Sequence, residues 1–268
     1  MPYNFSIAVK ERIDSNSLSM MLDGRVPLLV FKEVLPESFC ASIANRFLEY
    51  GYEERADGVP GLHVGSFHYG KSMGDYIEKS RGAEQIFKTQ FGASYAQLLE
   101  IHDIFEKELS LVGVKYRVAK YENSSAGQIV LRSWSGDGEY AVLPHEDMAQ
   151  LMDPLQSGFE IQKVAYTGNR AISVNMCFAS DSKSGQVQVW DLKPKQFHRR
   201  KFNVESTGYP YPASLIENVE CVEYAPKVGD IYCINGEYLH AVKRSSGFRL
   251  AGAFCFGRVS PSEVLYWT

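Results

Sequence analysis

Long hydrophobic runs and a strong excess of charge of one sign are both missing from this 268-residue chain. No stretch approaches about 18 consecutive apolar residues, the length that a membrane-spanning helix needs. The apolar run near the N-terminus is too short for the core of a signal peptide. The net charge is −4, which argues against a general nucleic-acid-binding protein. We therefore expect no membrane partner and no nucleic-acid partner.

Cysteine is also scarce, with five residues and no CxxC pair. An odd number without paired spacing gives no sign of a disulfide framework or of a thiolate metal site. Cys177, Cys233 and Cys255 lie within apolar segments and are predicted to be buried as small hydrophobic side chains. This pattern is typical of a reducing compartment, and we expect a cytoplasmic protein.

The composition is that of an ordinary globular protein. Hydrophobic residues make up 45% of the chain and aromatic residues 13%, which excludes disordered, collagen-like and coiled-coil proteins. The length allows one large domain or two small ones. Because no internal repeat, low-complexity tract or linker divides the chain, we expect residues 1–268 to form a single domain. The sequence leaves the oligomeric state open.

The chain changes character after its first 111 residues. Within them, apolar residues recur every three or four positions after Pro36 and again over about 75–110, which predicts two helical regions. A Gly-rich loop at 56–74 separates these regions. The rest of the chain has short segments of β-branched and aromatic residues between turn-forming clusters. We predict an α+β, mainly β fold, in which residues 112–268 form a sandwich or jelly roll and residues 1–111 form a mostly helical support.

An HxD triplet lies directly after an apolar segment, in AVLPHED. Alternate residues of an extended segment point to the same face, so the side chains of His145 and Asp147 are able to bind one metal ion. His240, in a strand-like segment, is the best candidate for a third ligand. Two histidines and one carboxylate form the ligand set of non-heme Fe(II) oxygenases. Zinc hydrolases are the alternative, but they usually use HExxH on a helix, which this sequence does not contain.

The position of Arg249 indicates that the HxD triplet is part of a metal site and not a chance match. It follows His240 by nine residues and lies among small and apolar residues in FRLAGAF. An arginine that is buried there needs an anionic partner, and the guanidinium fork suits a carboxylate. The alternative is an arginine on an edge strand that faces solvent.

The HxD triplet, the distal histidine and the following arginine together resemble the motif of the Fe(II)/2-oxoglutarate-dependent oxygenases. The fold of that superfamily is a double-stranded β-helix, which is a cupin-like jelly roll. The segments IVLRSWSGDGEYAVLPHED and GDIYCINGEYLHAV are most similar to the free-standing halogenase and hydroxylase group. This group includes hapalindole-type alkaloid halogenases, free-amino-acid halogenases and their hydroxylase relatives. The resemblance covers roughly residues 28–268, and the loops between the matching blocks agree poorly.

The resemblance implies that His145, Asp147 and His240 hold Fe(II), and that Arg249 pairs with the distal carboxylate of the cosubstrate 2-oxoglutarate. The halogenases of this group have glycine at the position of Asp147, where chloride binds instead. The presence of Asp147 therefore predicts O₂-dependent hydroxylation of an unactivated C–H bond in a small metabolite, with release of succinate and CO₂. The expected substrate is an amino acid, an amino-acid derivative or an alkaloid-like molecule. The alternatives are a halogenase, a desaturase or a cyclase of the same superfamily, or a β-barrel binding protein without catalysis.

Other residues are candidates for contacts with the cosubstrate or the substrate. Arg132 matches an arginine of the alkaloid halogenases and is expected to reach the cosubstrate or substrate, or else to form a structural salt bridge. Glu146 is expected to be an exposed spacer between two ligands. The basic segment 193–203 is interpreted as a solvated loop or as a lid for an anionic substrate. The weaker candidates for substrate contacts are His63, His68, Tyr69, Asn175, Gln188 and Trp267.

Overall fold

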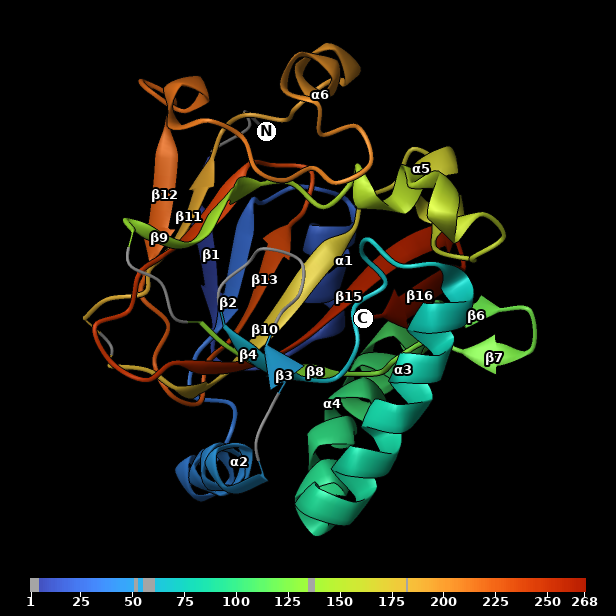
Figure 1. Ribbon diagram of the computed structural model, residues 1–268, viewed down its shortest axis with the longest axis vertical. Helices are drawn as coiled ribbons and strands as arrows, with labels where there is room; N and C mark the ends of the chain where they lie inside the picture. Colours follow the sequence, from blue (N-terminus) through green and yellow to red (C-terminus); the bar gives the residue numbers. More distant parts are fainter. Residues whose placement is uncertain (1–4, 51–52, 55–60, 135–137, 182) are drawn as a thin grey trace.

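The computed structural model of the chain describes residues 5–50, 53–54, 61–134, 138–181 and 183–268. These residues form a mixed α/β structure, with two β-sheets and helices around them (Figure 1). The α-helices are α1 (Ser15–Leu22), α2 (Glu37–Tyr50), α3 (Met73–Ile86), α4 (Ala93–Ser110), α5 (Gln162–Tyr166) and α6 (Gln196–Phe202). A π-helical turn at Phe87–Phe91 joins α3 to α4, and short 3-10 turns occur at Gln150–Met152, Pro154–Gln156 and Ala213–Leu215.

The larger sheet runs through most of the molecule. Its strands follow the order β1 (Ile7–Lys10), β2 (Leu28–Phe31), β13 (Ile231–Asn235), β10 (Ile172–Ala179), β15 (Leu250–Ser260), β8 (Val130–Ser133), β4 (Leu62–Val64) and β3 (Glu53–Glu54). At one side β16 (Glu263–Trp267) pairs with β15, and β5 (Lys115–Val118) pairs with β16. The β10 strand is buried along nearly its whole length, because strands pair with it on both sides and side chains pack on both faces.

The smaller sheet has the order β12 (Cys221–Tyr224), β11 (Val187–Trp190), β14 (His240–Lys243) and β9 (Tyr140–His145). A separate hairpin pairs β6 (Lys120–Tyr121) with β7 (Ser124–Ser125). From β8 to β15 the chain passes back and forth between the two sheets, with only β11 and β12 following each other in the same sheet. The strands β8, β10, β13 and β15 lie in the larger sheet, and β9, β11, β12 and β14 lie in the smaller one.

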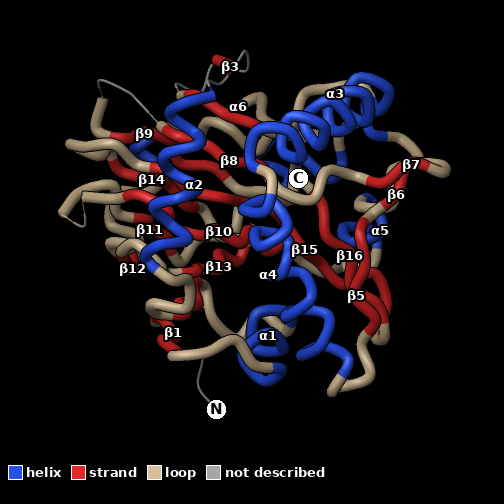
Figure 2. Tube along the Cα trace, turned by 90° about the horizontal axis from the view of Figure 1, so that it is seen from below, coloured by secondary structure: helices blue, strands red, loops and turns tan. Residues whose placement is uncertain are grey.

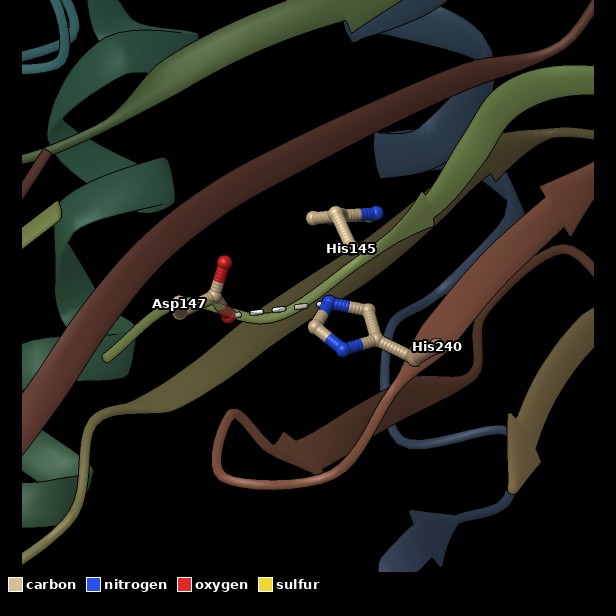
Figure 3. A group of neighbouring side chains, drawn as sticks. All are labelled: His145, Asp147 and His240. Carbon is tan, nitrogen blue, oxygen red and sulfur yellow. Dashed lines mark ion pairs between the residues drawn. The ribbon is translucent and has the colours of Figure 1, made fainter. Parts of the chain in front are cut away.

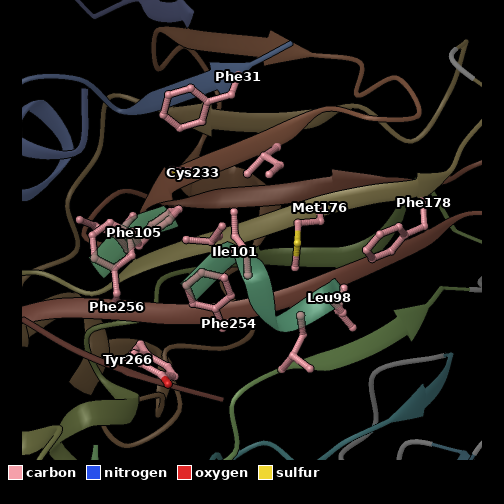
Figure 4. Packing of buried hydrophobic residues seen from close by; sticks show 14 of the residues in the cluster. Phe31, Leu98, Ile101, Phe105, Met176, Phe178, Cys233, Phe254, Phe256 and Tyr266 are labelled. Carbon is pink, nitrogen blue, oxygen red and sulfur yellow. The ribbon is translucent and has the colours of Figure 1, made fainter. Parts of the chain in front are cut away.

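Two apolar clusters cover the two faces of the larger sheet. Between the sheets, buried side chains of β2 and β13 pack against those of β11 and β14. On the other face lie α1, α2 and α4, which Figure 2 shows over the strands. Phe105 of α4 packs edge-to-face on Phe254 and Phe256 of β15, with ring centroids 5.6 and 5.5 Å apart (Figure 4). The helices therefore stabilise one face of the sheet and leave its inner face for the site.

Most of the predicted elements are present. The helix after Pro36 is α2, and the helical region at 75–110 is α3 and α4 with the π-helical turn between them. The strand-rich segments after residue 112 form β8 and β10–β15. The predicted loop at 56–74 begins outside the described residues, and its described part contains the short strand β4. The first 111 residues also supply strands to the larger sheet, because the apolar residues of β2 are buried between β1 and β13.

The structure also bears on the expectations from composition. Among the described residues, no helix is long and apolar enough to cross a membrane. All five cysteines are free thiols. Cys177 and Cys233 are buried as predicted, but Cys255 is partly exposed because it lines a pocket between the sheets.

Candidate active site

A pocket lies between the two sheets, with lining residues from both of them. It encloses about 920 Å³, including space that is open to solvent. Most of the lining side chains are apolar or aromatic, and a few polar groups converge on the space, as in typical small-molecule sites. His145, Asp147 and His240 are among these polar groups.

The pairing of β9 with β14 brings the two histidines together. His145 and His240 are directly opposite in this antiparallel register, and their ring centroids are 4.1 Å apart. Asp147 follows the end of β9, where its backbone N–H donates to the carbonyl of Gly236 at 2.9 Å. Ligand atoms of the three side chains all lie within 4.8 Å of one another (Figure 3). The structure thus brings together the three residues predicted from the sequence.

Backbone carbonyls fix the protonation of both imidazoles. Nδ1 of His145 lies 2.8 Å from the carbonyl of Leu143, and Nδ1 of His240 lies 2.9 Å from the carbonyl of Tyr238. A carbonyl only accepts, so each Nδ1 carries a proton, and in the neutral ring Nε2 then carries the lone pair. Such a bond to the second nitrogen orients a metal-binding histidine. Both side chains are therefore prepared to bind a metal ion through Nε2.

One oxygen of the Asp147 carboxylate has no hydrogen-bond donor among the described residues. This oxygen, Oδ2, is buried and lies 3.6 Å from Nε2 of His240. A Cβ added at Gly236 would lie 2.8 Å from this oxygen, so glycine at this position lets the chain approach the carboxylate. A buried carboxylate oxygen without a donor is costly, and a metal ion between the three side chains would satisfy it. Fe(II) fits this donor set of two imidazoles and one carboxylate.

Arg249 lies beside the pocket and is buried, with 2% of its surface exposed. Its Nη2 donates to the hydroxyl of Tyr232 at 2.9 Å, and the guanidinium lies 4.7 Å from the ring centre of Trp134. Burial raises the pKa of the Tyr232 hydroxyl, so that group stays neutral. The Nη1 atom is buried and has no hydrogen-bond partner among the described residues. The solvent-facing alternative for Arg249 is therefore wrong, and its free N–H groups suit an anion.

Arg132 and Asn175 lie together on the pocket wall. Nη2 of Arg132 donates to Oδ1 of Asn175 at 2.9 Å. The Arg132 guanidinium also lies 4.9 Å from the ring centre of Trp134 and 5.7 Å from that of Phe67. Two guanidinium groups therefore contact the same tryptophan, and Arg132 is the one that lines the pocket directly.

The weaker substrate candidates divide into two sets. His68 and Tyr69 line the pocket, whereas His63 in β4 is outside the lining set and packs near Phe67. Trp267 is fully buried in an apolar cluster, and the next residue, Thr268, lines the pocket in its place.

Gln188 does not face the pocket, contrary to the prediction. Val187 and Val189 of β11 occupy the inward positions, so the residue between them points the other way. The amide of Gln188 donates to Glu223 of β12 at 2.9 Å.

The prediction that Glu146 is an exposed spacer is wrong. Its side chain is completely buried and forms a bidentate pair with Arg199 of α6, at 2.9 and 3.1 Å. The same carboxylate accepts the backbone N–H groups of Met148 and Ala149. Burial raises the pKa of Glu146, and the nearby Arg199 opposes that rise. The basic segment is thus a helix, and one of its arginines holds the residue between two site residues.

Three aromatic side chains of the site were missed from the sequence. Tyr209 lies edge-on to His145, with ring centroids 5.8 Å apart, and Trp134 and Tyr232 contact Arg249. Trp134 carried a usable signal, because it is two residues after Arg132 and therefore shares its face of the strand. Tyr209 and Tyr232 carried none, since their positions depend on contacts between distant segments.

Comparison with known proteins places these features in context. No model of a known protein family matches the chain. The chain is 28% identical over 250 residues to L-isoleucine 3(1)-dioxygenase from Pantoea ananatis (strain AJ13355), with 90% of this chain and 83% of the relative covered. Its structure is similar to that of an N-substituted L-amino acid dioxygenase from Burkholderia ambifaria AMMD, with a TM-score of 0.58 and 11% identity over 95% and 91% of the two chains. The complex of that protein with alpha-KG gives a TM-score of 0.57 at 12% identity, with the same shares covered.

The structural likeness concerns the fold, and the likeness in sequence spans most of both chains. The site adds the chemical argument, because two histidines and a carboxylate converge in the pocket, and a buried, partly unsatisfied arginine contacts two of the residues that line it. The chain is thus similar in sequence to one amino-acid dioxygenase and in fold to another, and its site has the donor set of two imidazoles and one carboxylate that suits Fe(II).

Proposed function

We propose that this enzyme hydroxylates an unactivated C–H bond of a small amino acid or amino-acid derivative, with Fe(II), 2-oxoglutarate and O₂. The observation that carries the proposal is the convergence of His145, Asp147 and His240 in a pocket between the sheets, with an unsatisfied carboxylate oxygen among them. We also propose that the chain forms one domain whose strands β8–β15 are a double-stranded β-helix. The strand order supports this, since eight successive strands divide into two sheets of four in the jelly-roll manner.

In this proposal each polar group of the site has one role. His145 and His240 bind Fe(II) through Nε2, Asp147 binds it through its carboxylate, and Arg249 receives the distal carboxylate of 2-oxoglutarate. The bound metal supplies O₂ activation: 2-oxoglutarate, O₂ and the substrate C–H bond give succinate, CO₂ and the alcohol. The protein holds the two cosubstrates and the substrate in position and excludes water.

The nature of the substrate is supported by the pocket wall. Val130, Val142, Ile234 and Val242 give much of it an aliphatic character. The relative from Pantoea ananatis is named for L-isoleucine, whose side chain would suit such a wall. Asp147 supports hydroxylation over halogenation, because its carboxylate takes the metal position that a halide would need. L-Isoleucine and similar aliphatic amino acids are therefore the first substrates to examine.

The proposal is tested with the purified protein, Fe(II) and 2-oxoglutarate in air, against a panel of free and N-substituted L-amino acids. We expect succinate to form in step with one product that has gained a single oxygen atom. Zn(II) in place of Fe(II) is expected to stop the reaction. A product that has gained chlorine or lost two hydrogens would contradict hydroxylation. Turnover with Zn(II) and without 2-oxoglutarate would instead indicate a hydrolase.

A further inference from the structure

His68 is a buried histidine of the pocket that the proposed metal chemistry does not use. It is 5% exposed and follows β4 in the connection to α3. Its Nδ1 lies 2.9 Å from Oε1 of Gln156, and the Nε2 of Gln156 donates to the carbonyl of His68 at 3.1 Å. This second bond fixes the amide orientation, so Oε1 accepts and Nδ1 of His68 must be the donor. Nε2 of His68 is therefore an acceptor.

The surroundings of His68 keep the ring neutral and in place. Tyr76 and Phe159 pack edge-on to it, with ring centroids 6.3 and 6.4 Å away. Burial lowers the pKa of His68 to about 4. Its backbone N–H donates to the carbonyl of Thr268 at 3.0 Å, which anchors the main chain. Among the described residues, the hydrogen bond of the His68 side chain is made by Nδ1, to Gln156. His68 thus provides the pocket with a fixed, neutral hydrogen-bond acceptor.

The charges of the pocket show what this acceptor is suited to bind. Among the described lining residues, Asp147 is the only carboxylate side chain, and it belongs to the metal site. Arg132 supplies a cation to the lining, and the Oδ1 of its partner Asn175 is already an acceptor for that guanidinium. An amino acid presents a carboxylate and an N–H donor on one carbon. Arg132 suits the carboxylate, and Nε2 of His68 is a neutral acceptor suited to the N–H donor.

We propose that Nε2 of His68 accepts a hydrogen bond from the α-amino group of the substrate, while Arg132 binds its carboxylate. This inference rests on the proposed function and names the substrate class. The enzyme selects α-amino acids that retain at least one N–H, free or singly N-substituted, over the matching acids without nitrogen. His68 is thereby a specificity-determining residue on the side of the pocket formed by Phe67, His68 and Tyr69.

The test measures binding without turnover. The Ni(II)- and 2-oxoglutarate-loaded enzyme is titrated with the aliphatic amino acid that the wild type turns over best, and with the same acid lacking the amino group. The variants are His68→Phe, which keeps a ring but removes the acceptor, and His68→Gln, whose amide oxygen reaches a similar position. A hydrogen bond to a charged group corresponds to about a 10-fold or larger change in affinity. We expect His68→Phe to lose about 10-fold of the preference for the amino compound, and His68→Gln to retain most of it.

The outcomes separate this inference from the function on which it rests. If His68→Phe weakens both ligands equally, or leaves the preference unchanged, His68 has only a packing role and the inference is wrong. If the wild type neither binds nor oxidises any amino acid, the proposed function fails and the inference fails with it. A nitrogen-15 NMR measurement on the wild type gives an answer even if a variant does not fold. We expect an unprotonated Nε2 at neutral pH whose resonance moves with the amino compound and not with the acid, and equal responses would overturn the proposal.

Discussion

Two parts of the pocket differ in how their side chains are held: the metal end, at His145, Asp147 and His240, and the part at Phe67, His68 and Tyr69, which we call the far end. At the metal end, His145 and His240 face each other across two hydrogen-bonded strands, and Asp147 is two residues from the first of them. At the far end, His68 lies in a connection, and its partner Gln156 is 88 residues away in the sequence. The first arrangement follows from strand register, and the second depends on contacts between distant segments. This difference suggests that the metal end supplies a general chemistry and that the far end selects the substrate.

Removal of the carboxylate ligand is expected to have the largest effect. Asp147→Ala leaves two imidazoles to hold the metal, so we expect turnover to fall about 1,000-fold or more, equivalent to ~4 kcal/mol. Metal affinity, measured by titration with Fe(II) under anaerobic conditions, should fall as well. Asp191→Ala, at an exposed aspartate after β11, is the matched control and should change neither quantity. Normal metal affinity in Asp147→Ala would show that the metal ion binds elsewhere.

The second largest effect is expected at Arg249, which is buried beside the pocket. Arg249→Gln removes the buried cation, and loss of one partner of a buried charge pair typically costs about 2–5 kcal/mol. We expect the KM for 2-oxoglutarate to rise about 100-fold, with a much smaller change in the KM for the substrate. Arg258→Gln serves as control, because Arg258 lies in β15, the strand that begins directly after Arg249, and pairs with Asp23. A rise in the KM for the substrate alone would mean that Arg249 binds the substrate rather than 2-oxoglutarate.

The Glu146–Arg199 pair tests whether the metal end depends on support from outside its strands. Arg199→Met leaves the fully buried carboxylate of Glu146 without its cation, and such a change lowers the free energy of unfolding by about 3 kcal/mol. The double variant Glu146→Gln/Arg199→Met removes the buried charge and should recover part of that loss. Denaturant unfolding of the wild type, of the single variants Glu146→Gln and Arg199→Met, and of the double variant gives the coupling between the two residues. Additive effects would mean that the Glu146–Arg199 pair contributes no coupling energy to the stability of the fold.

The last prediction concerns buried histidines outside the metal site. Burial lowers the pKa of His68 and of His102 to about 4. The unfolded chain binds these protons below about pH 6.5, so stability should fall as the pH drops from 6.5 towards 4, by up to ~1.4 kcal/mol per pH unit for each histidine. His102→Gln should show a shallower fall over this range in denaturant unfolding. The same slope in both proteins would show that His102 is protonated in the folded state.

The contrast between local strand register and contacts of distant segments also explains which features could be predicted from the sequence. The HxD spacing and the apolar segments around His240 and Arg249 are local signals. The structure brings His145, Asp147 and His240 together and buries Arg249 against two residues that line the same pocket. The strands of the second half were predictable for the same reason, since β-branched and aromatic residues mark each segment.

Contacts between distant segments were not predictable. Glu146 looked like an exposed spacer because its partner Arg199 is 53 residues away. Gln188 was placed on the inner face, although the valines on either side of it occupy that face. The acceptor role inferred for His68 depends on Gln156, and no local pattern indicates that pairing. The positions of these side chains follow only from the three-dimensional structure.

The most direct test of the central claim is a reaction under ¹⁸O₂ with Fe(II), 2-oxoglutarate and the best aliphatic amino acid, followed by mass spectrometry of both products. The account predicts that one labelled oxygen enters succinate and that the amino acid gains one oxygen from O₂ at a carbon of its side chain. Succinate formation without substrate oxidation, or an oxidised product without succinate, would contradict it.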